Sequence, residues 1–236
     1  MKVFINPGHS KDCNPDAGCC YNGIKEATIC AEIANFLADE LLKANIPCIV
    51  YQQTGNDLTS NQQLNTVAKE ANKSGADLFI SIHMNGHNNE TADGTEVWYQ
   101  EGSVKGKAFA SYLLNQMTLA FGDKLLCNRG IKEAKGTLAV LRDTSMPAAL
   151  VEVCFISNKS DADFIKANRT NVAKRLALAI KNYYGISSQD TSKNHAEYKL
   201  EHVEDDKYDL YVDGKMMLAA NKFSTCIDYL ENHYGV

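Results

Sequence analysis

The chain lacks the excess of positive charge that is typical of nucleic-acid-binding proteins. Its 236 residues include 24 Lys and Arg against 29 Asp and Glu, a formal net charge of -5, and the pI is near 5.7. No block of Lys or Arg indicates contact with an anionic membrane surface. The composition therefore predicts no nucleic-acid partner and favours a neutral or mixed-charge substrate.

Long apolar runs are also absent. No run approaches the ~20 residues that a helix needs to span a bilayer, so we expect no membrane insertion. The N-terminus passes directly into the apolar strand pattern of residues 3–5, without the basic and apolar regions of a signal peptide. The sequence as given therefore predicts a soluble chain that is not addressed to the secretory route.

The chain has eight cysteines but no Cys-x-x-Cys pair, the usual spacing of a structural zinc site. Cys13, Cys19 and Cys20 crowd one loop, which leaves open a local disulfide or a second metal site. Without a leader to an oxidising compartment, we expect free thiols. Three further cysteines lie within apolar patterns and are predicted core residues: Cys30, Cys48 and Cys154.

Strand and helix patterns alternate along the chain to about residue 185. This order predicts an α/β fold, with a mostly parallel or mixed sheet of about six strands and helices on both faces. The predicted strands are residues 3–5, 46–51, 76–83, 94–99, 137–141 and 148–155. The predicted helices are residues 26–44, 61–73, 105–121 and, after an Asn158 N-cap and with one interruption, a stretch that ends at Tyr184.

One carboxylate interrupts the most apolar of these strands. Glu152 lies within residues 150–156, where an unpaired buried charge is so costly that a chemical role is expected. His9 directly follows the first strand, and His83 ends the third. Functional groups of such sheets gather outside the carboxyl ends of the strands. Two imidazoles and a carboxylate that lie at the carboxyl ends of strands predict a zinc hydrolase site.

Glu26 is the predicted third metal ligand. It opens the first long helix after the loop that His9 begins, and its side chain can turn back over the strand ends. The alternative is a carboxylate that compensates the helix dipole. For His9 and His83, taken singly, the alternative is a hydrogen-bonded structural histidine.

The most specific segments are Ser81-Ile82-His83-Met84-Asn85 and Glu152-Val153-Cys154-Phe155-Ile156-Ser157-Asn158. Together with other matches over residues 2–185, they resemble the type 3 N-acetylmuramoyl-L-alanine amidases. These are zinc enzymes of bacteria and phages that cut peptidoglycan between N-acetylmuramic acid and the L-alanine of the stem peptide. The other matching segments are residues 5–9, the helix start at Glu26, and residues 71–72, 129–130, 140–142 and 146–148.

The resemblance implies that one Zn²⁺ per chain is bound by His9, Glu26 and His83. It also implies that Glu152 is the catalytic carboxylate, which takes the proton of the attacking water and returns it to the leaving nitrogen. Three departures from the family pattern leave these residues intact. Val67 replaces an Arg, while Ser10 and Cys154 each replace a Gly.

Asn85 and Arg142 are predicted to bind the substrate or assist the reaction. The alternatives are a turn-capping Asn and a solvated surface Arg. His87 stands four residues after His83, but it lies in a loop rather than on a helix, so we expect it in solvent. Asp57, Asp161 and Asp163 have no predicted partner and are treated as surface or capping residues.

The predicted domains are a zinc amidase catalytic domain over residues 1–185, a linker over 186–200 and a small ββα module over 201–236. In the module, strands 208–212 and 215–219 flank the turn signal Asp213-Gly214, and a helix follows over 224–233. A module of this size needs a surface to pack on. We predict wall attachment or self-association as a homodimer, with packing on the catalytic domain as the alternative.

The predicted partner is peptidoglycan or a muropeptide. Two other functions stay open, namely a zinc peptidase that cuts another amide of the wall peptide and an inactive cell-wall-binding protein. The predicted location follows from the missing leader. The protein is expected to be made in the cytoplasm and to reach the wall after release, as a phage or prophage lysin does, or to be a leaderless form of a secreted enzyme.

Overall fold

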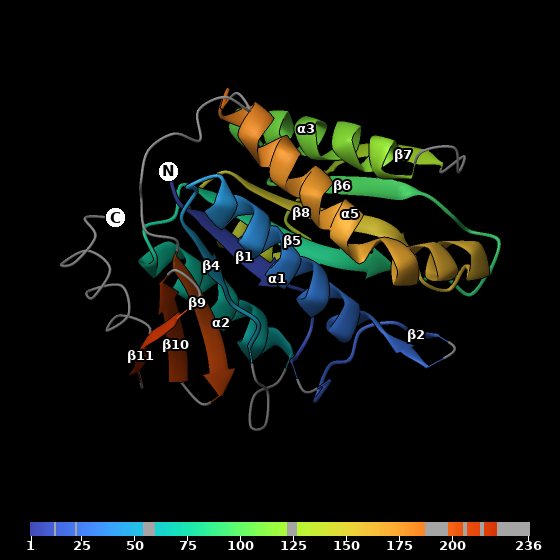
Figure 1. The fold of residues 1–236 in the computed structure, drawn as a ribbon. Helices are drawn as coiled ribbons and strands as arrows, with labels where there is room; N and C mark the ends of the chain where they lie inside the picture. The colour runs from blue at the N-terminus through green and yellow to red at the C-terminus, as the bar shows by residue number, and fades with distance from the viewer. Residues whose placement is uncertain are drawn as a thin grey trace.

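The computed structural model describes the backbone of residues 1–11, 13–21, 23–53, 60–121, 127–186, 198–204, 207–212 and 215–220. Within these ranges, side chains are described up to residue 186, except for residues 60–63. All structural statements below refer to these residues. The fold is an α/β arrangement in which one twisted sheet runs through the molecule (Figure 1).

Six neighbouring strands, from β4 to the edge strand β7, form the larger part of the sheet, and most neighbouring pairs among them are parallel. Only β8 and β6 pair antiparallel, so the predicted mixed, mostly parallel sheet is confirmed. The order across the sheet is β4 (Cys48–Val50), β1 (Val3–Pro7), β5 (Leu78–Asn85), β8 (Ala148–Phe155), β6 (Thr95–Tyr99) and β7 (Asn128–Glu133).

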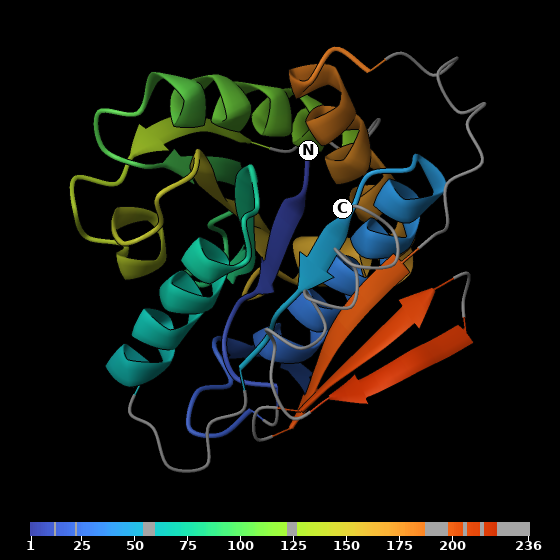
Figure 2. The same cartoon turned by 90° about the vertical axis from the view of Figure 1, so that its left-hand side faces the viewer.

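Helices cover both faces of this sheet, as the sequence predicted (Figure 2). One face packs against α1 (Glu26–Lys43), α3 (Val104–Ala120) and α5 (Lys159–Tyr183). The other packs against α2 (Ser60–Lys73) and the short α4 (Ala139–Arg142). Successive strand residues alternate between the two faces, so each strand supplies both cores. We call the face that carries α2 and α4 the site face, because His83 and Glu152 belong to it by this alternation.

The expected strand over residues 137–141 is wrong. Residues 139–142 form the helix α4, whose Val140 and Leu141 are buried in the core of the site face. The sixth strand is β7, whose sequence Asn-Arg-Gly-Ile-Lys-Glu is mostly polar. A short apolar run does not distinguish a strand from a helical turn, and a partly exposed edge strand needs no apolar pattern.

The long helices start and end close to the expected residues. The Asn158 side chain caps α5 by accepting hydrogen bonds from the backbone N–H groups of Ser160 and Asp161, as predicted. The expected interruption of this helix is confirmed at Asn168, which has non-helical φ and ψ angles. Among the described residues, none of the helices has the length and apolar composition to cross a membrane.

Three strands extend the sheet beyond β4. The predicted hairpin is present as β10 (Lys207–Val212) and β11 (Lys215–Ala220), which pair antiparallel. The sequence did not predict β9 (Tyr198–Glu204), which begins inside the expected linker and pairs parallel with β4. The helix expected over residues 224–233 lies outside the described residues, and so does Asp57.

The cysteines of the described residues are free thiols. Cys30, Cys48 and Cys154 are fully or almost fully buried in the core of the α1, α3 and α5 face, which confirms the expectation from their apolar surroundings.

Candidate metal centre

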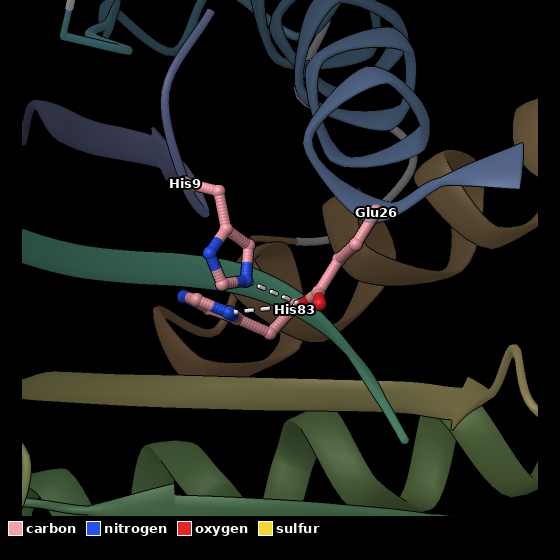
Figure 3. Close-up of side chains that lie close together, drawn as sticks. All are labelled: His9, Glu26 and His83. Carbon is pink, nitrogen blue, oxygen red and sulfur yellow. Dashed lines mark hydrogen bonds and ion pairs between the residues drawn. The ribbon is translucent and has the colours of Figure 1, made fainter. Parts of the chain in front are cut away.

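The candidate centre lies where the chain leaves β1 and β5 and enters α1. His9 follows β1, His83 lies near the end of β5, and Glu26 is the first residue of α1. Their side chains point toward one another (Figure 3). The Glu26 Oε1 atom lies 2.9 Å from His9 Nε2 and 3.1 Å from His83 Nδ1. One possible ligand atom from each residue lies within 4.8 Å of the others.

The donor atoms of this cluster suit a zinc ion. Two imidazole nitrogens and one carboxylate oxygen form a donor set typical of catalytic zinc, with further coordination left for water or substrate. The His9 Nε2 atom is buried and makes no hydrogen bond of acceptable geometry, although Glu26 Oε1 is 2.9 Å away. A buried nitrogen left in this way fits a metal ligand better than a structural hydrogen bond.

Asp16 orients His9 from behind, and sequence reasoning missed it. Its Oδ2 atom lies 2.8 Å from His9 Nδ1, and its Oδ1 atom accepts a hydrogen bond from the Gly18 N–H at 3.0 Å. A carboxylate on Nδ1 leaves Nε2 available for a metal, the usual arrangement behind metal-binding histidines. The short Asp-Ala-Gly sequence is the only signal that the sequence offers, and it also fits an ordinary turn.

Backbone N–H groups hold the Glu26 carboxylate in place. Its Oε2 atom accepts from Cys19 N–H at 2.8 Å, and its Oε1 atom accepts from Met84 N–H at 2.9 Å. Burial opposes ionisation of Glu26, but the hydrogen bond from His83 and the close imidazole of His9 outweigh it and hold the pKa of Glu26 far below the usual range. Burial also lowers the pKa of His9, but the nearby carboxylates of Glu26 and Asp16 dominate and raise that pKa to about 9.

Two glycines make room for the cluster. A side chain on Gly8 would collide with the His83 ring, and one on Gly18 would collide with Glu26 and His9. Gly18 also has a φ angle of +68°, which L-residues with a side chain rarely adopt. The loop between β1 and α1 therefore depends on glycine at both positions.

Glu152 lies beside His83 on the neighbouring strand. The β5–β8 register pairs the two residues directly, so their side chains leave the sheet on the same face. Glu152 Oε2 is buried and has no hydrogen-bond partner among the described residues. Burial raises the pKa of Glu152 to about 7, against the opposing effect of His83. An ionisable carboxylate with a pKa near neutrality is suited to accept and return a proton.

A second buried carboxylate, Glu96, pairs with Glu152 across β6 and β8. Its Oε2 atom binds Arg129 Nε at 2.6 Å and Lys132 Nζ at 2.7 Å, while its Oε1 accepts from Trp98 Nε1 at 3.1 Å. Burial opposes its ionisation, but Lys132 and Arg129 lower its pKa below the usual value. Sequence reasoning missed this cluster, because its two cations come from the unpredicted strand β7.

Two cavities of about 560 Å³ adjoin the cluster, and both are lined by His9 and His83. Asn85 lines the cavity that also contains Glu152, and its Oδ1 accepts from Gly86 N–H at 3.1 Å, as a turn-capping Asn does. Arg142 lines the other cavity, and its guanidinium binds the Asp143 carboxylate at 2.6 and 2.7 Å. Both residues thus border the site.

The remaining polar residues divide between surface and interior. His87 is exposed in the loop after β5, as expected, and its Nδ1 accepts from the Asn89 N–H at 2.9 Å. Asp163 is exposed and binds Lys159 at 2.6 Å. Asp161 was expected to be a surface or capping residue. It does not lie on the surface, because its side chain is only 1% exposed.

Fold and site together define an α/β protein with a candidate metal centre at the carboxyl edge of its sheet. Residues 3–182 match the family model described as N-acetylmuramoyl-L-alanine amidase. The chain therefore belongs to this family, and the resemblance found in the sequence is confirmed.

Individual relatives agree with this assignment. The chain is 28% identical over 166 residues to the N-acetylmuramoyl-L-alanine amidase LytC of Bacillus subtilis, a match that covers 70% of this chain and 31% of that protein. It is 33% identical over 168 residues to the endolysin of Bacillus phage SPP1, which covers 70% of this chain and 58% of the endolysin. The chain thus spans less than two thirds of either protein.

Among solved structures, the N-acetylmuramoyl-L-alanine amidase from Clostridium difficile 630 superposes with a TM-score of 0.67 at 28% sequence identity. The match covers 80% of this chain and 97% of that one. The match therefore spans nearly the whole of that solved chain.

Proposed function

We propose that this protein hydrolyses the amide bond between N-acetylmuramic acid and L-alanine in peptidoglycan. Membership of the amidase family supports the reaction and the substrate. The observation that carries the proposal at this chain's own residues is the His9–Glu26–His83 cluster with the buried Glu152 beside it. Peptidoglycan or a soluble muropeptide is therefore the proposed partner.

The proposed metal is one zinc ion per chain, held by His9, Glu26 and His83. When bound there, zinc would supply Lewis-acid polarisation of the scissile carbonyl and activation of water. Asp16 would keep the His9 Nδ1 atom protonated, so that Nε2 carries the lone pair for the metal. Glu26 would contribute the negative charge of the ligand set, with its carboxylate oriented by the backbone N–H groups of Cys19 and Met84.

Glu152 is the proposed general base and general acid. Its carboxylate would take a proton from the attacking water and deliver it to the nitrogen of L-alanine as the amide bond breaks. Among the described residues, the buried Oε2 atom has no hydrogen-bond partner, which supports this role because no structural hydrogen bond occupies the atom. Asn85 and Arg142 are the proposed substrate contacts, one in each cavity beside the cluster.

The reaction is tested by mass spectrometry of purified peptidoglycan after digestion. The expected products are free stem peptides that begin with an L-alanine amine and glycan strands that carry the free lactyl carboxyl group. Cleavage at a different amide would contradict the proposal and support the zinc peptidase. Metal analysis of the same preparation should give about one zinc per chain, and chelation should remove the activity.

The proposed place of action is the bacterial cell wall. The endolysin of phage SPP1 is one relative, which is consistent with a lysin that acts after release. The proposed role of residues 201–236 is attachment to the wall or self-association.

A further inference from the structure

The strand that carries Glu152 contains a β-bulge directly after it. Along β5 and β8, His83 pairs with Glu152, and Asn85 pairs with Phe155. Two steps on β5 thus match three steps on β8, so β8 holds one extra residue. The side chains confirm the irregularity, because the consecutive residues Val153 and Cys154 are both buried in the core of the α1, α3 and α5 face. A regular strand would place one of them on the site face.

The bulge changes the hydrogen bonding of β8, and Asp161 compensates. The Phe155 N–H donates to Asp161 Oδ2 at 3.0 Å. Asp161 lies in the first turn of α5 and is only 1% exposed. A buried carboxylate is costly unless it is hydrogen-bonded, so its presence beside the bulge calls for a specific role. Its bond to Phe155 ties the bulge to the start of α5.

Beyond the bulge, β8 returns to register with β5. The Ile156 N–H donates to the Asn85 carbonyl at 3.0 Å. On the opposite side of β8, the buried Thr95 hydroxyl donates to the Glu152 carbonyl at 3.0 Å. The backbone of Glu152 is therefore held laterally by Thr95, while Asp161 holds the bend that follows it.

We propose that Asp161 is a positioning residue for Glu152. By accepting the Phe155 N–H, its carboxylate fixes the bulge and thereby the direction in which the Glu152 side chain meets the substrate. The inference rests on the proposed function, because it assumes that Glu152 transfers the proton. A general base must lie within hydrogen-bond reach of its proton, and misplacement by about 1 Å can reduce a rate about 10²-fold.

The test compares three variants by steady-state kinetics on a soluble muropeptide. Asp161→Ala removes the acceptor, so kcat should fall about 10- to 100-fold with KM and zinc content unchanged. Asp161→Asn keeps an acceptor oxygen and should retain most of the activity. Asp163→Ala is the matched control, because it removes an exposed carboxylate from the start of α5 that pairs with the exposed Lys159. If Asp161→Ala does not fold, Asp161→Ser replaces it, since the shorter side chain does not reach Phe155.

A double variant separates positioning from general structural support. In the Glu152→Gln background, Asp161→Ala should cause little further loss of kcat, because the group that it positions is already disabled. Amide hydrogen exchange at Phe155 should be faster in Asp161→Ala than in Asp163→Ala. Full additivity of the two kcat losses, or an unchanged kcat in Asp161→Ala, would overturn the positioning role. An inactive parent enzyme would instead contradict the proposed function.

Discussion

At the scale of single residues, burial and chemistry are coupled at Glu152. A solvent-exposed glutamate has a pKa of about 4.3, whereas burial raises the pKa of Glu152 to about 7. A carboxylate with this pKa accepts a proton more readily than an exposed glutamate does, and it can still release that proton near neutral pH. The same burial makes Glu152 costly to the fold, and its position in a strand is consistent with the proposed role in the reaction.

Replacing this carboxylate tests the role directly. Glu152→Gln keeps the shape of the side chain and all three metal ligands but removes the base, so kcat should fall by a factor on the order of 10² or more. Zinc content should stay at the parental level. The control is Glu40→Gln, which removes a carboxylate from α1 that binds Lys43 on the protein surface. Near-parental activity of Glu152→Gln would show that another group transfers the proton.

The pKa of Glu152 also predicts the acid limb of the pH profile. Only the ionised carboxylate accepts a proton, so kcat/KM should decrease as the pH falls through the pKa of Glu152. That pKa is about 7 in the metal-free protein, and a bound cation favours the ionised form, so the midpoint is expected at or below 7. The residual activity of Glu152→Gln should lack this limb. A limb that persists unchanged in Glu152→Gln would assign it to a different group.

At the scale of elements, the segment that connects β1 and α1 supplies more of the residues at the candidate metal centre than β1 or α1 does. It carries His9 and Asp16, and it brings Gly18 against Glu26 and His9. The loop thus combines a proposed metal ligand, the carboxylate that contacts it, and the space that the cluster needs. The ends of β1, β5 and α1 supply the fixed points to which this loop is attached.

Gly18→Ala should therefore damage the metal centre. The added methyl group would collide with Glu26 and His9, and zinc affinity should fall at least about 10- to 100-fold, the range for disturbed outer-shell partners. Gly23→Ala is a close control, because Gly23 has a similar φ angle of +77° but open space around its Cβ position. Both variants carry the same backbone strain, so equal zinc loss in the two would assign the effect to strain rather than to the collision. Isothermal titration of zinc into the metal-free proteins measures the difference.

At the scale of the whole molecule, the described part of the C-terminal region joins the sheet of the amidase domain. The strand β9 pairs with β4 over Cys48–Val50, and β10 and β11 continue from it. The candidate metal centre is built from the ends of β1 and β5 and the start of α1, and in the sheet only β4 separates β9 from β1. The extension therefore covers an edge of the sheet without contributing one of the predicted site residues.

Truncation after Gly185 should leave a folded, zinc-loaded enzyme that cuts soluble muropeptides but acts more slowly on intact walls. Loss of β9 exposes β4 as an edge, so the melting temperature should fall by about 2–4 °C for each kcal/mol lost. Truncation after Glu204 is the matched control, because it keeps β9 and removes the hairpin. If the protein that ends at Gly185 aggregates or loses zinc, the tail is part of the core and the targeting role fails.

The sequence by itself determined the elements with strong apolar patterns and the residues that break those patterns. The strand that carries Glu152, the strand that ends at His83 and the helix that starts at Glu26 were all predictable, since burial leaves a periodic signal. A charge in an apolar strand is equally visible. The resemblance to the amidases then connected residues far apart in the chain, which periodicity alone does not.

Tertiary structure decided what lacks such a signal. The edge strand β7 and the strand β9, which lies between β4 and β10, have mixed or polar sequences. Pairing with neighbours makes them strands, so residues 128–133 and 198–204 were missed. The roles of Asp16, Glu96 and Asp161 depend on which backbone or side-chain groups lie opposite them after folding. Their carboxylates look alike in the sequence, and only the three-dimensional contacts distinguish a residue that orients His9 or holds a bulge from one that is solvated.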